Sequence, residues 1–173
     1  MRTVGWLLLG VGGCGTPVDP DVDHGVEVPA RAPDETIQAN LAIGADMSSV
    51  QWAHDAFCWS AGGDDAFSGF HVLFVRQQPA DTDVWLRAKP AADVDVSLYY
   101  VQAAPEVTAV PPELTAADIF SCDAMFLASG NAGQGETLLA AGASALPLII
   151  GVAGAADAEV GSFTLEIWGL PAE

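Results

Sequence analysis

Residues 93–101, DVDVSLYYV, decide the fold. Apolar and polar side chains alternate here with a period of two residues, which is the pattern of a β-strand with one buried and one solvent-facing side. The side chains expected to face inward are Val94, Val96, Leu98 and Tyr100, and those expected to face water are Asp93, Asp95, Ser97 and Tyr99. The stretch therefore predicts a strand that covers a hydrophobic core.

The same alternation recurs before and after this strand. Residues 83–89 (DVWLRAK) and 162–168 (SFTLEIW) place apolar side chains at every second position, and residues 70–75 (FHVLFV) are apolar on both faces. Further strands are expected at 36–43, 136–141 and 146–153, separated by turns rich in Gly, Pro and Asp. We predict one all-β domain over residues 35–173, an antiparallel β-sandwich. Residues 102–118 contain three Pro and are predicted to form a long loop.

The charge of the chain limits its partners. It carries 5 Lys and Arg against 23 Asp and Glu, a formal net charge of −18 over 173 residues. Such a field repels the phosphate backbone of nucleic acids, and it repels anionic lipid surfaces in the same way. We expect no nucleic-acid binding, and the acidity favours divalent cations or basic partners.

The N-terminal residues have the pattern of an export signal. Arg2 precedes a short apolar run over residues 4–11, and small residues lead to Cys14. Residues 11–14 (VGGC) are similar to a bacterial lipobox, in which the Cys becomes lipidated after cleavage. We expect a signal peptide at 1–13, a lipidated Cys14, and an acidic Pro-rich tether to residue 34. The protein would then be exported and lipid-anchored to the bacterial envelope, at the outer membrane. The alternative is an ordinary signal peptide with Cys14 incidental.

The three cysteines support this interpretation. If Cys14 carries lipid, Cys58 and Cys122 remain as a disulfide pair in an oxidising compartment. Closing that loop of about 65 residues would stabilise the fold by roughly 4 kcal/mol in the chain-entropy treatment. Two buried free thiols, or a zinc site with His54 and Asp123, are the alternatives that the sequence leaves open.

Four aspartates form a candidate calcium site. Asp93 and Asp95 share a strand face, while Asp81 and Asp83 end the neighbouring turn. Carboxylate oxygens that converge from two segments are the ligands that Ca²⁺ prefers. The alternative is that these residues terminate strands and solvate turns, as Asp commonly does. The sequence thus makes calcium a candidate cofactor, and the absence of any cofactor is the alternative.

Three aromatic residues form a candidate binding surface. Trp85, Tyr99 and Trp168 all fall on the polar phase of their strands. Outward aromatic rings on a sandwich stack on sugars or anchor protein partners. The alternatives are that the tether or the long loop covers them, or that the inward and outward assignments are reversed.

The sequence offers little for catalysis. It has no G-x-S-x-G motif, and His71 lies inside an expected strand, where it is expected to pack in the interior. We expect a non-enzymatic module that binds an unknown protein or glycan partner. A metal-dependent hydrolytic enzyme and a purely structural envelope protein remain alternatives.

Several motifs are similar to those of bacterial pre-peptidase C-terminal (PPC) domains. DVDVSLYY at 93–100 resembles a characteristic strand of that family, and FHVLFV at 70–75 resembles an earlier strand. Residues 135–169, from GETLL to LEIWG, resemble the end of the family's domain. The resemblance spans about residues 57–169 and implies a secreted, non-catalytic β-sandwich of jelly-roll type, stabilised by calcium in some members. The chain departs from the family in lacking a protease domain and in the length of the 102–118 loop.

Overall fold

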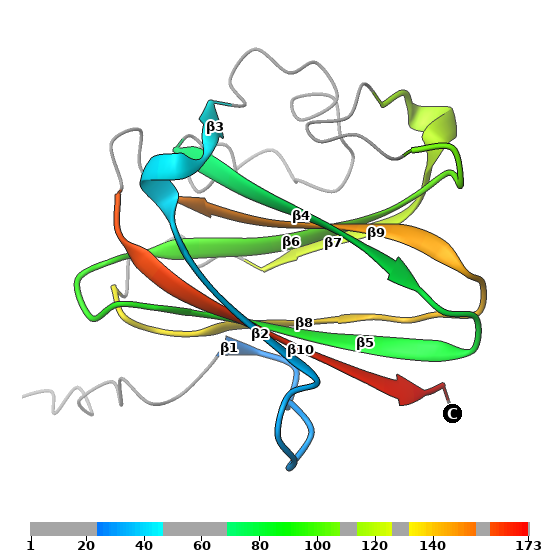
Figure 1. The fold of residues 1–173 in the computed structure, drawn as a ribbon, viewed down its shortest axis with the longest axis horizontal. Coiled ribbons are helices and arrows are strands. Elements are labelled where there is room, and N and C mark those ends of the chain that lie inside the picture. The colour runs from blue at the N-terminus through cyan, green and yellow to red at the C-terminus, as the bar shows by residue number, and fades with distance from the viewer. Residues whose placement is uncertain (1–23, 47–68, 108–113, 126–131, 155–159, 173) are drawn as a thin grey trace, which may run out of the picture.

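The computed structural model describes residues 24–46, 69–107, 114–125, 132–154 and 160–172. These residues form two five-stranded sheets packed face to face (Figure 1). The prediction of an all-β antiparallel sandwich is confirmed. Cys14, Cys58 and His54 lie outside the described residues, so the lipidation, disulfide and zinc hypotheses that involve them stay predictions.

The first sheet has the order β1-β8-β5-β10-β2. Neighbouring strands in this sheet are antiparallel, except for β1 and β8, which form a short parallel pair. The strands are β1 (His24–Gly25), β8 (Glu136–Ala140), β5 (Thr82–Pro90), β10 (Ser162–Pro171) and β2 (Glu35–Asn40).

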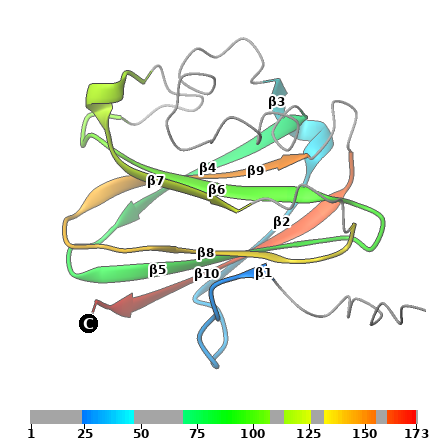
Figure 2. The same ribbon diagram turned by 180° about the vertical axis from the view of Figure 1, so that it is seen from behind.

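The second sheet has the order β3-β4-β9-β6-β7, and all its pairings are antiparallel. The strands are β3 (Ala45–Asp46), β4 (Phe70–Gln78), β9 (Leu146–Gly154), β6 (Val96–Ala103) and β7 (Ile119–Met125). Two short 3-10 helices, η1 (Leu41–Ile43) and η3 (Ala116–Asp118), connect strands. β2 and β4 lie on one side of the sandwich, and β7 and β8 lie on the other, as the view from behind shows (Figure 2).

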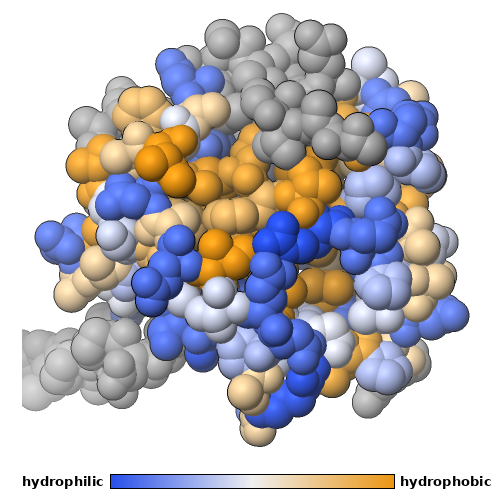
Figure 3. Space-filling view, viewed as in Figure 1, coloured by the Kyte–Doolittle hydropathy of each residue, from blue (hydrophilic) through white to orange (hydrophobic). Residues whose placement is uncertain are grey.

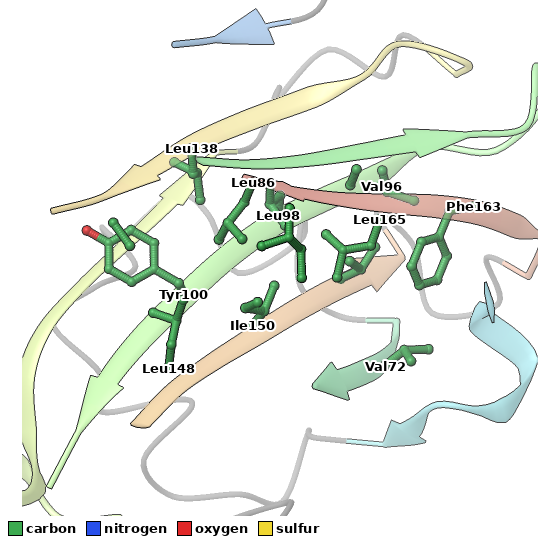
Figure 4. Close-up of a cluster of buried hydrophobic side chains, with 14 of the residues drawn as sticks. Val72, Leu86, Val96, Leu98, Tyr100, Leu138, Leu148, Ile150, Phe163 and Leu165 are labelled. Carbon is green, nitrogen blue, oxygen red and sulfur yellow. The ribbon is translucent and has the colours of Figure 1, made fainter. Parts of the chain in front are cut away.

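The main core lies between the two sheets. Side chains from both sheets point toward one another there (Figure 4), among them Leu86, Leu98, Tyr100, Leu138, Leu148, Ile150, Phe163 and Leu165. The alternation over residues 83–89 and 162–168 assigned the inward phase of β5 and β10 correctly. Burying each such side chain contributes about 1.5–3 kcal/mol relative to leaving it in water.

The prediction that one face of the 93–101 strand is exposed to solvent is wrong. Every residue of β6 is buried, including Ser97 and Tyr99, which were expected outside. β6 lies between β9 and β7, and a second apolar cluster of Val101, Ala103, Leu114 and Ile149 covers the far face of the sheet. The strand also begins at Val96, so Asp93 and Asp95 belong to the preceding turn.

The loop predicted at residues 102–118 is shorter than expected, because both of its ends belong to secondary structure. Its first two residues continue β6, and its last three form η3, which Asp118 stabilises by accepting hydrogen bonds from the backbone N–H and hydroxyl of Thr115. β7 follows directly. β7 was not predicted as a strand, because polar residues interrupt its apolar pattern.

Candidate functional site

The three predicted surface aromatics do not form one surface. Trp85 and Trp168 are register partners on β5 and β10, whereas Tyr99 belongs to β6 in the other sheet. Tyr99 is 1% exposed and Trp168 is 2% exposed, so neither presents its ring to solvent. The expectation of an outward aromatic patch is therefore wrong for these two residues.

Trp168 is buried, and it contacts Arg31 and Arg87. Its indole N–H donates to the carbonyl of Arg31 at 2.9 Å, and the Arg87 guanidinium lies 5.5 Å from its ring centroid. Asp34 anchors the segment around Arg31 by accepting from Arg31 and from the backbone N–H of Gly169, and these bonds lower the pKa of Asp34 to about 2. The C-terminal part of the predicted tether thus lies against the first sheet.

Tyr99 is held in the interior by a polar partner. Its hydroxyl lies 2.8 Å from Nδ1 of His71, which is 2% exposed. Its ring lies over Gly151, its register partner on β9, and burial raises the pKa of Tyr99 far above its ordinary value. His71 is packed inside the protein, as predicted.

The four aspartates do not converge on a calcium ion. Asp81 and Asp83 lie at the start of β5, and Asp93 and Asp95 follow its end. The strand between them separates the two pairs by more than about 20 Å, given roughly 3.3 Å per residue. Among the described residues, no group of three or more His, Cys, Asp or Glu could hold a metal ion. Asp83 instead accepts a hydrogen bond from the backbone N–H of Gly142 at 3.0 Å, which fits the alternative role of Asp in turns.

A groove on the outer face of the first sheet is the strongest candidate site. It has a volume of about 570 Å³ and is lined by β2, β10 and the end of β5. Ala39, Phe163 and Ala88 belong to the core, so the alternating residues on these strands face outward. The outward side chains in the groove are polar, and they are Gln38, Asn40, Lys89, Ser162 and Thr164.

Lys89 gives the groove a local positive charge. Arg31, Arg76 and Arg87 are each paired with a carboxylate. Within the described part of the chain, Lys89 is the cation for which no carboxylate partner is found, and its side chain is exposed. The groove thus combines hydroxyl, amide and ammonium groups.

The sequence contains part of the signal for this groove. Gln38, Asn40, Ser162 and Thr164 occupy the polar phase of two predicted strands. Their proximity depends on the pairing of β2 with β10, in which Ser162 is the register partner of Asn40, and Asn40 donates to the Ser162 hydroxyl at 3.2 Å. No local pattern reveals a pairing over such a sequence separation, so the groove was missed.

Cys122 is disulfide-bonded. Because Cys58 lies outside the described residues, its pairing with Cys122 stays a prediction.

None of the helices among the described residues is long and apolar enough to cross a membrane. Comparison of the chain with protein families, curated proteins and solved structures finds no match.

Proposed function

We propose that this chain is a non-catalytic, lipid-anchored protein of the bacterial envelope whose β-sandwich binds carbohydrate in the groove between β2, β10 and β5. The observation that carries the proposal is a set of polar side chains in an open groove on a sheet face, beside the apolar Pro90 and Ala91. Sugars present many hydroxyl groups, each of which both donates and accepts hydrogen bonds. The amide, hydroxyl and ammonium groups of the lining match that requirement.

Lys89 favours sugars that carry a carboxylate. A hydrogen bond between an ammonium and a carboxylate is about twice as strong as one between neutral groups. Because the whole chain carries a net charge of −18, a single local cation would select a short acidic sugar over a long polyanion.

The proposed location of the protein in the bacterial envelope rests on its N-terminal sequence. Arg2, the apolar run and Cys14 support export and lipidation. The sandwich itself is proposed to be of the PPC-like jelly-roll type. Repeated crossing between sheets supports this, since β4, β5 and β6 alternate between them, as do β8, β9 and β10.

Calorimetric titration of the full chain tests the binding. The probes are a neutral tetramer of N-acetylglucosamine and an acidic tetramer of galacturonate. We expect binding of the acidic tetramer, which Lys89→Ala weakens by about tenfold because one charge-assisted hydrogen bond is lost. Gln77→Ala, an exposed change on β4 in the other sheet, should leave the affinity unchanged. Absence of binding by both tetramers, or equal effects of the two substitutions, would refute the groove as the site.

Membrane fractionation tests the anchor separately. Metabolic labelling with palmitate should mark the wild-type protein, and Cys14→Ala should abolish both the label and the membrane association. A Cys14→Ala protein that stays in the membrane fraction at the wild-type level would contradict lipidation.

A further inference from the structure

The outer edge of β2 exposes backbone hydrogen-bonding groups. β2 is the last strand of the first sheet, and within the described residues it pairs only with β10. The N–H of Leu41 donates to the carbonyl of Gly161 in this ladder at 2.9 Å. Because hydrogen-bonded pairs alternate in an antiparallel ladder, the backbone groups of Thr36 and Gln38 point away from β10.

Within the described residues, the strand β2 itself lacks the devices that usually block strand addition. Edge strands are commonly protected by Lys, Pro, a β-bulge or very short length. β2 spans six residues, ETIQAN, without Lys or Pro, and its register with β10 is uninterrupted. Its one charged residue, Glu35, is engaged by Arg76 of β4.

Apolar side chains lie beside this edge, between the two sheets. Ile37 and Ala39 of β2 and Phe74 of β4 are only partly buried, although they pack against the main core. The Glu35–Arg76 ion pair joins the two sheets at the same side of the sandwich. In the space-filling view, apolar surface is visible on this side, interrupted by hydrophilic groups (Figure 3).

We propose that the edge of β2 binds an extended segment of a partner protein, which adds a strand to the first sheet. The segment would carry apolar residues at alternate positions, which cover Ile37, Ala39 and Phe74. Lys or Arg would occupy the positions between them, because these face solvent and the chain has a net charge of −18. The same charge repels a second copy of this chain. This site is distinct from the proposed sugar groove, because it uses the backbone of β2.

A peptide probe tests the added strand. The probe is a fluorescent ten-residue peptide with Val at every second position and Lys or Thr at the positions between. It is titrated into the full chain, and binding is followed by fluorescence anisotropy. Gln38→Pro removes one outward N–H and leaves the β10 ladder intact, so it should weaken binding at least tenfold. Gln38→Ala keeps the N–H and should bind within twofold of the wild type, although it changes the sugar groove.

A modified peptide provides a readout that leaves the protein unchanged. N-methylation of every second peptide amide blocks one edge of the probe only. Two such peptides exist, one methylated at the odd and one at the even amides, and we expect one of them to lose binding and the other to keep it. We also expect the affinity of the unmodified peptide to fall with added salt. Equal binding of both methylated peptides, or wild-type affinity in a folded Gln38→Pro protein, would overturn the proposal. The proposal would also be overturned if sedimentation showed dimers of the protein that the peptide does not dissociate, because a second copy of the chain would then occupy the edge.

Discussion

Gly151→Ala places a methyl group in the space that the Tyr99 ring occupies. An ideal Cβ at residue 151 would lie 1.9 Å from Cζ of Tyr99 and 2.3 Å from Cε1. Non-bonded carbon atoms need about 3.5–4.0 Å, so the ring must retreat by roughly 1.5–2 Å. Tyr99 is 1% exposed and hydrogen-bonded to His71, so this movement displaces packed neighbours and strains the hydrogen bond.

The expected loss of stability is about 3 kcal/mol. Overpacking a well-packed interior typically costs about 1–3 kcal/mol, and loss of the Tyr99–His71 hydrogen bond adds about 1 kcal/mol. Ala is favoured over Gly in a strand by roughly 0.5–1 kcal/mol, which offsets part of the cost. For a chain of this length, such a change lowers Tm by roughly 6–12 °C.

Urea unfolding followed by circular dichroism measures this change. The midpoint should fall while the m-value stays constant. Gly169→Ala is the matched control, because the nearest atom to its added methyl is Cγ2 of Thr82 at 3.4 Å, an ordinary contact. We expect that control to leave stability unchanged or to raise it by up to about 1 kcal/mol, because Ala is favoured over Gly in a strand.

A double-mutant cycle identifies the cause. In a Tyr99→Ala background the ring is absent, so Gly151→Ala should cost less than about 1 kcal/mol, with a coupling energy near 2 kcal/mol. The reasoning is refuted if Gly151→Ala costs the same in both backgrounds, or costs less than about 1 kcal/mol in the wild type.

Three further predictions follow from buried and paired groups. Gln102→Leu should cost about 2 kcal/mol in urea unfolding, because Gln102 donates to Gln78 and to the carbonyl of Ala141 in the interior. In an NMR titration, the pKa of the Asp34 carboxyl should be about 2 rather than 3.8. The stability that the ionised carboxylate gives the folded state is present above about pH 4 and is lost as pH falls toward 2. The two tyrosines, whose pKa values are raised by burial, should show no phenolate absorbance with a midpoint near 10 in the folded protein. The stability that they contribute is present below pH 10 and is lost as pH rises.

Each of these predictions has a control. Gln77→Leu changes an exposed neighbour of Gln78 and should alter stability by less than about 0.5 kcal/mol. Arg31→Ala should return the pKa of Asp34 toward its ordinary value, and an unchanged pKa would show that Arg31 is not its main partner. Phenolate that appears near pH 10 without unfolding would contradict the burial of the tyrosines.

The strands that the sequence predicts well are those with a clear local pattern. The expected strands at 83–89, 136–141, 146–153 and 162–168 correspond to β5, β8, β9 and β10 within a few residues. Apolar side chains with a period of two, bounded by Gly, Pro and Asp turns, determine these segments locally. β7 was missed, because Ser121 and Asp123 interrupt its apolar residues.

The candidate sites depended on long-range pairing and were predicted poorly. Asp83 and Asp93 are close in sequence, but β5 carries the chain across the sandwich between them. Trp168 falls on a polar phase, and its contact with Arg31, far away in sequence, could not be read from that pattern. The Pro-rich composition of residues 15–34 predicts a tether and contains no signal for that contact.

The pairing of β2 with β10 has a consequence for the order of folding. In the described structure the first long strand has the last strand as its only sheet partner, with Glu35 opposite Ile167. Closing contacts of such sequence separation is slow, and it cannot begin until the C-terminal residues have left the ribosome. A chain that stops before Ser162 would leave both β2 and one edge of β5 without a neighbour. Premature termination should therefore produce an aggregation-prone remnant and not a smaller folded unit.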